Sequence, residues 1–350
     1  MMKRVVVVDD SRTIRAWLRA VLETDPRLTV VGEAENANQA RQVIKDTKPD
    51  VITLDIQMPG MSGLEFLTKL MKLHPLPVVM VSAATTFGSE ATIAALMNGA
   101  VDCILKPSNG TDAKACRDMA RRVFSAASST VQAPKQRRTS PAKFYDTTTN
   151  GPLPIILMGA STGGVAALEV ILGDLRVDGP PVVVVQHMPA TFLISFSKLL
   201  DRKFRQDVSL AADGESLSAG QIVLAPEQGF HTEISRRDNS WVTHLRPNAE
   251  RAAHCPSVDT LFSSAAPFGH DVIGVILTGL GRDGAEGLHQ LHRSGAQTIG
   301  QDQESSVVYG MPKAAWDLGA VDQQLPLNQI GAAINMAVQK HHRNPDRSVK

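Results

Sequence analysis

Cysteine is scarce in this chain, its charges nearly cancel, and it has no long hydrophobic run. The three cysteines form no CxxC pair, which argues against a disulfide framework and favours a reducing compartment. The 36 Lys and Arg residues offset the 35 Asp and Glu residues to a net charge of +1, so composition favours neither nucleic acid nor an anionic membrane as the main partner. The apolar runs are too short to span a bilayer or to form the core of a secretory signal. We therefore expect a cytoplasmic protein with no nucleic-acid partner and no membrane insertion.

A length of 350 residues predicts two domains. In the first part, residues 1–127, short apolar runs alternate with amphipathic helical patterns, which predicts an α/β fold with a parallel, doubly wound sheet. The predicted strands are 4–8, 29–32, 51–54, 78–81 and 103–105. Residues 128–152 are polar and contain proline, and we expect them to form a flexible linker.

Residues 153–345 return to the same alternation and predict a second domain, again with a doubly wound, Rossmann-like parallel sheet. The predicted strands are 155–158, 182–186, 221–225, 272–278 and one near 298. One segment departs from this pattern, because residues 230–235 and 241–245 flank a polar turn and predict an inserted β-hairpin.

Acidic and phosphate-binding residue types follow the predicted strands of the first domain. Asp9 and Asp10 follow the first strand, Asp55 the third, Ser82 the fourth and Lys106 the fifth. Because the carboxyl ends of parallel strands open into one crevice, we expect these side chains to meet there. Three carboxylates in one place predict a Mg²⁺ site, and the lysine and the serine are suited to phosphoryl oxygens. One of the aspartates could then accept a phosphoryl group covalently.

A Gly-x-Ser-x-Gly pattern around Ser161 follows the first predicted strand of the second domain and opens a helix. His187 ends the next strand, and Asp283 follows the strand 272–278. Taken singly, the serine could be a helix N-cap, the histidine could bond backbone groups and the aspartate could lie in a turn. Their occurrence at three strand ends favours a Ser-His-Asp hydrolase.

Two other assignments of this second domain are less consistent with the sequence. A dinucleotide-binding fold requires Gly-x-Gly-x-x-Gly, which residues 159–164 do not match. An α/β-hydrolase places its histidine last, and the late candidates His289 and His292 lie in a helical pattern. Asp259 precedes a helix and is the second-ranked candidate for the acid, after Asp283.

The first domain resembles the receiver domain of bacterial response regulators over residues 3–127. The resemblance is carried by VVDDS (7–11), LDIQMPGMSGLEFL (54–67), VSAA (81–84) and LKP (105–107). It implies a flavodoxin-like fold in which Asp55 is phosphorylated by a sensor histidine kinase. It also implies that Asp10 and Asp55 bind Mg²⁺ together with the backbone carbonyl of Gln57, with Asp9 supporting the metal's ligand shell. The sequence departs from the family at Cys103, where an aromatic switch residue is usual.

Residues 155 to about 337 resemble the chemotaxis protein-glutamate methylesterases, which also deamidate receptor glutamines. The matching segments are GASTGG (159–164), QHMP (186–189), HCPSVDTLF (254–262), GVILTGLGRDG (274–284) and VVYGMP (307–312). The resemblance implies esterase chemistry on the cytoplasmic helices of methyl-accepting chemoreceptors. It implies an oxyanion site formed by the backbone N–H of Leu280 and the helix start at Thr162, with no cofactor. It also implies that the unphosphorylated receiver obstructs the esterase crevice.

The sequence departs from the methylesterase pattern in two ways: Ala253 and Cys255 stand where arginines often flank the family histidine, and Leu280 replaces a frequent methionine. A receiver can also control a transcription factor. That output requires a compact basic helix-turn-helix, and residues 151–350 instead predict a strand-rich α/β domain with no basic recognition helix.

Overall fold

The computed structural model describes residues 2–82, 90–106, 113–129, 131, 153–227, 229–249 and 254–343. The chain divides into two compact units, residues 1–137 and 138–350. The division falls inside the predicted linker, most of which lies outside the described residues. None of the described helices is both long and apolar enough to cross a membrane.

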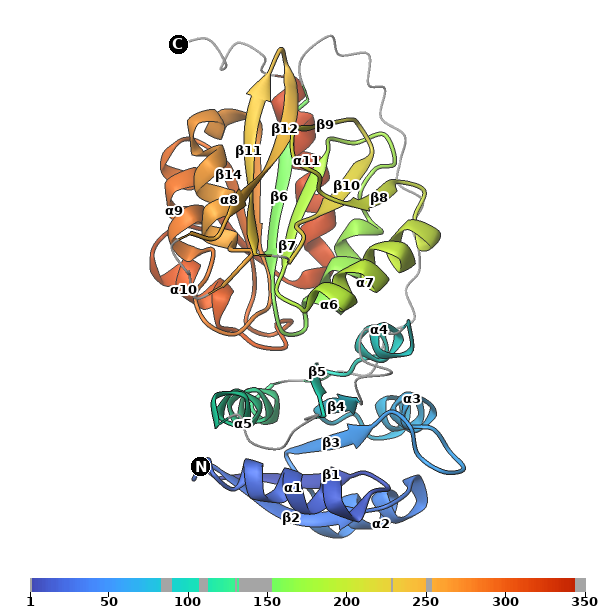
Figure 1. The fold of residues 1–350 in the computed structure, drawn as a ribbon. Coiled ribbons are helices and arrows are strands. Elements are labelled where there is room, and N and C mark those ends of the chain that lie inside the picture. The colour runs from blue at the N-terminus through green and yellow to red at the C-terminus, as the bar shows by residue number, and fades with distance from the viewer. Residues whose placement is uncertain are drawn as a thin grey trace. The chain divides into compact units, whose positions relative to one another are not determined.

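The N-terminal unit has a five-stranded parallel sheet with the order β2-β1-β3-β4-β5 (Figure 1), which is the flavodoxin-like arrangement that the sequence predicted. The strands are β1 (Lys3–Val8), β2 (Leu28–Ala34), β3 (Val51–Asp55), β4 (Val78–Ser82) and β5 (Asp102–Leu105). The helices are α1 (Arg12–Leu22), α2 (Ala37–Thr47), α3 (Gly63–Leu73), α4 (Glu90–Met97) and α5 (Ala113–Ala127).

The apolar runs of this unit form its central strands because both faces of the sheet are covered. Every residue of β3 and β4 is buried, which explains why these strands do not alternate between polar and apolar residues. Polar residues after the strands start the helices: the side chains of Ser11, Asn36 and Ser62 accept hydrogen bonds from backbone N–H groups in the first turns of α1, α2 and α3. The ends of β1, β2 and β3 are therefore followed by capped helix starts, and Asp9, Asp10 and Asp55 lie at or just after the ends of β1 and β3.

The C-terminal unit has a seven-stranded parallel sheet with the order β15-β14-β13-β6-β7-β10-β8 (Figure 1). Its strands are β6 (Ile155–Ala160), β7 (Val182–Gln186), β8 (Asp207–Leu210), β10 (Gln221–Leu224), β13 (Val272–Ile276), β14 (Gln297–Gln301) and β15 (Gln323–Leu325). Its helices are α6 (Gly164–Leu172), α7 (Ala190–Lys203), α8 (Val258–Ala265), α9 (Ala285–Arg293), α10 (Met311–Asp317) and α11 (Leu327–Arg343), and a 3₁₀ helix, η1 (Ala266–Asp271), precedes β13.

The direction of winding reverses at β6. The chain passes from β6 to β7 on one side of it and later returns through β13 on the other side. Consistent with this reversal, α6 packs with α11 whereas α8 packs with α9 (Figure 1). In open α/β sheets, the crevice outside the carboxyl ends of the strands at such a reversal is the usual binding site.

The predicted hairpin is present and longer than expected. Strand β11 (Phe230–Arg237) pairs antiparallel with β12 (Ser240–Pro247) through Asp238 and Asn239, whose φ angles are 49° and 69°. Two consecutive residues with positive φ give the tight turn whose twist suits a hairpin. A third strand, β9 (Glu215–Leu217), which the sequence did not predict, pairs with β12.

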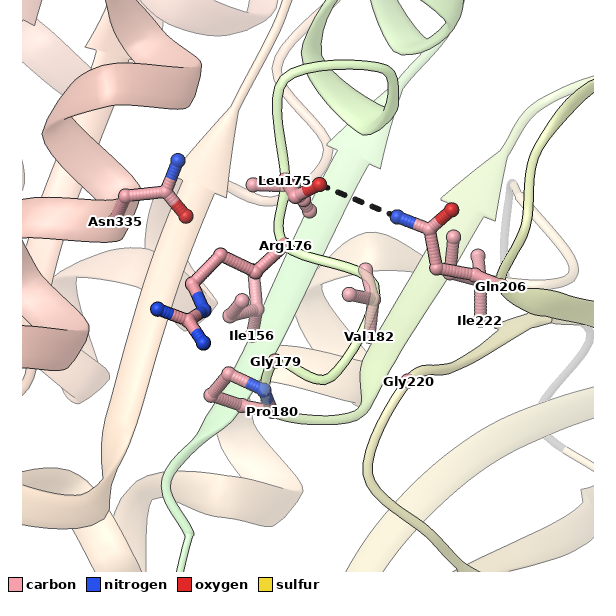
Figure 2. A pocket seen from close by; sticks show the side chains of 10 residues that line it. All are labelled: Ile156, Leu175, Arg176, Gly179, Pro180, Val182, Gln206, Gly220, Ile222 and Asn335. Atoms are coloured by element: carbon pink, nitrogen blue, oxygen red, sulfur yellow. Dashed lines mark hydrogen bonds between the residues drawn. The ribbon is translucent and has the colours of Figure 1, made fainter. Parts of the chain in front are cut away.

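A small cavity lies at the amino ends of β6, β7 and β10 (Figure 2). Ser161 and His187 follow the opposite, carboxyl ends of β6 and β7. Ile156, Val182 and Ile222 line it, together with polar groups that include Gln206, whose Nε2 donates to the Leu175 carbonyl at 3.3 Å. Its volume of about 10 Å³ is room for one water molecule, so it is not a substrate site.

Candidate functional site

Ser161 occupies the turn between β6 and α6. Its backbone N–H donates to the Thr278 carbonyl at 3.0 Å, which ties the turn to the segment after β13. The N-cap of α6 is Gly163, with a φ of 80°, so the Ser161 side chain does not have the capping role that was its simplest alternative. A Cβ at Gly163 would also lie 2.6 Å from the side chain of Val307, so this turn requires glycine at that position. The strand-turn-helix context expected for an exposed serine nucleophile is therefore present.

His187 is adjacent to Ser161 through strand pairing. Ala160 pairs with Gln186 in the β6–β7 ladder, so Ser161 and His187 are the next residues on two neighbouring strands. Neighbouring strands lie about 4.8 Å apart, within reach of a serine and a histidine side chain. The buried side-chain amide of Gln186 donates to the carbonyls of both residues, at 2.9 Å for Ser161 and 3.2 Å for His187. This amide fixes the backbones of the two residues relative to each other.

Asp283 supplies the carboxylate of the group. Its Oδ2 lies 2.8 Å from His187 Nε2, and the backbone N–H groups of Val258 and Asp259 donate to its two oxygens at 2.9 and 3.0 Å. Burial alone would raise the pKa of Asp283, but the hydrogen bond and charge of His187 and these backbone donors outweigh it and hold the pKa well below its usual range. Asp283 therefore remains an anion next to the imidazole.

The pairing with Asp283 fixes which histidine nitrogen can act as a base. Because Nε2 of His187 donates to the carboxylate, the lone pair is on Nδ1. Nδ1 is buried and has no hydrogen-bond partner among the described residues. The structure thus provides an oriented imidazole with one unengaged acceptor nitrogen next to the turn that carries Ser161.

The alternative residues have other roles. Asp259 lies in the first turn of α8, where its Oδ1 accepts from the Gly287 N–H at 2.7 Å. Burial and the neighbouring charge of Asp283 raise the pKa of Asp259, so it is the less favourable of the two anions. His289 and His292 both lie in α9, and His292 Nε2 is 3.0 Å from Asp322 Oδ1. The structure therefore gives the His187 contact to Asp283, the first-ranked acid.

The segment after β13 passes close to Ser161. A Cβ at Gly279 would lie 2.7 Å from the Ser161 Cβ, so glycine is needed for this approach. Thr278 Oγ1 donates to the Thr162 carbonyl at 3.0 Å, which joins the same segment to the start of α6. Leu280 is the next residue of this segment and is half-buried. Both expected oxyanion residues, Thr162 and Leu280, thus adjoin the serine turn.

The sequence did not reveal the position of His254. Its ring stacks on that of His187, with centroids 4.6 Å apart and planes inclined by 10°. His254 is exposed and comes four residues before α8, the helix whose first N–H groups hold Asp283. The motif around residues 254–262 was the available signal, but it did not indicate which side chain the histidine contacts.

The N-terminal unit gathers its carboxylates as expected. Single oxygen atoms of Asp9, Asp10 and Asp55 all lie within 4.8 Å of one another. Lys106 Nζ lies 2.7 Å from Asp9 Oδ2 and 2.8 Å from Asp55 Oδ2. Burial raises the pKa of Asp55, Lys106 lowers it in part, and the charge of Asp9 raises it further. A partly buried group of like charges such as this is suited to a hard divalent cation.

The remaining predicted residues of this unit surround the carboxylates. Ser82 is fully buried at the end of β4, and its carbonyl accepts from the Lys106 N–H at 2.7 Å. Gln57 lies in the loop after β3 and lines an open hollow together with Asp10. Cys103 is buried in β5, where burial strongly raises the pKa of its thiol, so it is a neutral side chain.

Two family models match the chain, and they agree with the two units. The response regulator receiver domain model matches residues 5–116, and the CheB methylesterase model matches residues 156–334. The protein-glutamate methylesterase/protein-glutamine glutaminase of Agrobacterium fabrum is 46% identical over 341 residues, which is 95% of each chain. That of Caulobacter vibrioides is 44% identical over 335 residues, covering 95% of this chain and 96% of its own.

A solved structure supports the assignment of the second unit. The catalytic domain of the Thermotoga maritima CheB methylesterase aligns with a TM-score of 0.50 at 33% identity, over 54% of this chain and 98% of its own. The relatives match both units over nearly the full chain. The chain therefore belongs to the protein-glutamate methylesterase/protein-glutamine glutaminase family, in which a response regulator receiver domain precedes a CheB methylesterase domain.

Proposed function

We propose that this protein is a phosphorylation-controlled serine hydrolase that demethylates glutamate γ-methyl esters on chemoreceptors and deamidates receptor glutamines. The observation that carries the proposal is the contact between His187 and Asp283 beside the Ser161 turn, at the point where the sheet winding reverses. Its substrates are the cytoplasmic helices of methyl-accepting chemoreceptors, and its location is the cytoplasm.

Acyl transfer begins at Ser161. Its Oγ attacks the ester carbonyl carbon while Nδ1 of His187 takes the hydroxyl proton, and Asp283 stabilises the imidazolium that forms. The bond to the methoxy oxygen then breaks, and His187 returns the proton so that methanol leaves. The backbone N–H of Leu280 and the start of α6 at Thr162 stabilise the negative charge that develops on the carbonyl oxygen.

Water completes the cycle at the same residues. His187 takes a proton from water, the hydroxide attacks the acyl-enzyme, and Ser161 regains its proton as glutamate leaves. A glutamine side chain offers the same carbonyl with ammonia as the leaving group, so one site performs both reactions. The protein and water supply every group that these two reactions need, so the esterase site uses no cofactor.

The receiver supplies control through Asp55. This carboxylate accepts the phosphoryl group from a sensor histidine kinase, and Lys106 and Ser82 contact the phosphoryl oxygens. Asp10, Asp55 and the Gln57 backbone carbonyl would hold Mg²⁺, with Asp9 supporting its ligand shell, and the ion would neutralise charge on the phosphoryl oxygens. The grouping of the three carboxylates and the raised pKa of Asp55 support this assignment.

A mass-spectrometric assay on methylated receptor fragments tests the proposal. Wild-type protein should convert glutamate methyl esters to glutamate, and should convert glutamine at equivalent positions to glutamate. Salt-sensitive binding of DNA by the protein, without ester hydrolysis, would instead favour a transcription factor and contradict the proposal.

A further inference from the structure

Asp283 accepts hydrogen bonds from the start of α8, and the start of α8 is in turn hydrogen-bonded to β11 of the inserted sheet. Besides His187 and two backbone N–H groups, Asp283 accepts a hydrogen bond from Ser257 Oγ, at 2.9 Å to Oδ1. Ser257 is buried, at 7% exposure, and is the N-cap of α8. Among the described residues, Asp283 thus has four hydrogen-bond partners, and Ser257 is the one that contributes a side-chain hydroxyl.

The hydrogen bonds of Ser257 determine where its hydroxyl proton points. The Thr260 N–H donates to Ser257 Oγ at 3.2 Å, so the oxygen already accepts the capping bond. Its single proton is therefore directed at Asp283, which as a carboxylate can only accept. One residue both starts α8 and donates to the triad acid.

His231 fixes Ser257 from the other side. The Ser257 N–H donates to His231 Nδ1 at 3.1 Å, and both residues are buried. Since Nδ1 accepts, the His231 ring carries its proton on Nε2. His231 belongs to β11, so this bond joins the inserted antiparallel sheet to the residue that contacts Asp283.

We propose that His231 and Ser257 are positioning residues for Asp283, so that the inserted sheet orients the triad through the line His231–Ser257–Asp283–His187. This inference rests on the proposed function. A carboxylate that loses its hydroxyl donor can rotate about its Cβ–Cγ bond, and the imidazole that it orients then departs from the geometry that proton transfer needs. Both positioning residues are buried, and the contacts of Ser257 run to His231 and Asp283, so we assign them no direct role toward the substrate.

Ser264 provides a matched control for a purely structural role. Its Oγ accepts from the Ile234 N–H at 2.9 Å and donates to the Leu261 carbonyl at 2.7 Å. It therefore also joins α8 to β11 through a hydroxyl, but neither of these two bonds involves Asp283. Ser264→Ala should lower the melting temperature while leaving kcat unchanged.

The test compares methyl-ester hydrolysis and thermal unfolding in full-length variants. Ser257→Ala should lower kcat by roughly ten- to a hundredfold, the rate equivalent of one hydrogen bond to a charged group, with KM unchanged. Ser257→Thr keeps the hydroxyl and should restore most of kcat. His231→Leu should lower kcat similarly, whereas His231→Asn places an amide oxygen at the Nδ1 position and should retain activity.

Two further measurements separate positioning from general destabilisation. The double variant Ser257→Ala with His231→Leu should be no slower than the slower single variant. Both changes interrupt the same series of hydrogen bonds from His231 through Ser257 to Asp283, so their effects should not add. The low-field proton resonance of the His187–Asp283 bond should weaken in Ser257→Ala and persist in Ser264→Ala. A Ser257→Ala protein with wild-type kcat, or a loss of kcat in Ser264→Ala equal to that in Ser257→Ala, would overturn the inference. Wild-type protein without esterase activity would instead overturn the proposed function.

Discussion

His187 Nε2 lies 2.8 Å from Asp283 Oδ2, although 96 residues separate the two in the chain. The parallel sheet produces this contact because β7 and β13 flank β6 and direct their carboxyl ends to the same edge. The same edge carries Ser161 at the end of β6, one residue beyond the Ala160–Gln186 pair. Three residues that are distant in sequence are therefore brought to one edge of the sheet by strand order rather than by any local motif.

The two candidate acids can be separated by isosteric substitution. Asp283→Asn should lower kcat about ten-thousand-fold, because the imidazole loses the anion that orients it and stabilises its cation. Asp259→Asn should have a much smaller effect, because an asparagine Oδ1 can still accept from the Gly287 N–H. Steady-state rates of ester hydrolysis for the two variants decide between them. A larger loss in Asp259→Asn than in Asp283→Asn would mean that the wrong carboxylate is assigned to the triad.

Replacing Gln186 tests how its side-chain amide contributes to the stability of the same site. Its side-chain amide donates to the carbonyls of Ser161 and His187, and the residue is 2% exposed. Gln186→Glu replaces this donor by a carboxylate facing two carbonyl oxygens. The free energy of unfolding should fall by roughly 3 kcal/mol or more, the order of cost of an unpaired buried charge. Denaturant titration at neutral pH measures this change, and an unchanged midpoint would show that the amide does not hold the two backbones.

The raised pKa of Asp55 predicts that the stability of the receiver depends on pH. Burial raises its pKa, so the folded receiver binds the Asp55 proton more tightly than the unfolded chain does. This contribution to stability is fully present below the unfolded pKa of about 3.9 and is lost as the pH rises through the folded value. At pH 7 the ionised Asp55 therefore destabilises the receiver. Asp55→Asn should raise its melting temperature at pH 7 in the presence of a chelator, and the difference should shrink below about pH 4.

Calorimetry of the full-length protein across this pH range checks the prediction. The sign of the change in melting temperature depends on the balance between burial and Lys106. Lys106 Nζ lies 2.8 Å from Asp55 Oδ2 and lowers the pKa of Asp55, whereas burial raises it. A lower melting temperature in Asp55→Asn at pH 7 would mean that the ion pair with Lys106 outweighs the cost of burying the carboxylate.

If the receiver controls the esterase, removing the receiver should change the basal rate of ester hydrolysis. We expect the unphosphorylated receiver to obstruct the Ser161 crevice, so deleting residues 1–140 should raise basal ester hydrolysis, by about tenfold if the coupling is typical of allosteric proteins. Asp55→Asn in the full chain should hold the low basal rate even with a phosphodonor and Mg²⁺. A truncated protein no faster than the unphosphorylated full-length protein would mean that the receiver acts by recruiting the esterase to its receptors.

Much of the fold could be predicted because its central strands are buried on both faces. The short valine runs at residues 5–8 and 182–185 favour such strands because valine is β-branched, and the residues that follow them lie at the functional edge. Edge strands were harder to predict. Strand β15 has the sequence QQL and is exposed at Gln323, so it contains no apolar run from which it could be predicted. Strands β8 (DVSL) and β9 (ESL) also lack an apolar run and were not predicted.

Strand ends and side-chain contacts depend on tertiary structure. The predicted strand 272–278 is shorter in the structure and ends at Ile276, and beyond it the Thr278 N–H donates to a side chain, Gln301 Oε1, at 2.9 Å. The stacking of His254 on His187 and the line from His231 to Asp283 join segments that are distant in the chain. Periodicity and spacing carry no signal for such contacts.

The central claim is that Ser161 is the nucleophile, and the most direct measurement is methanol release from a methylated receptor fragment by Ser161→Ala protein. The variant should fold normally, because the half-exposed side chain contributes little packing and Gly163, not Ser161, caps α6. Turnover should fall on the order of a million-fold, the typical cost of removing a nucleophilic serine. Near-wild-type methanol release from well-folded Ser161→Ala protein would contradict this account.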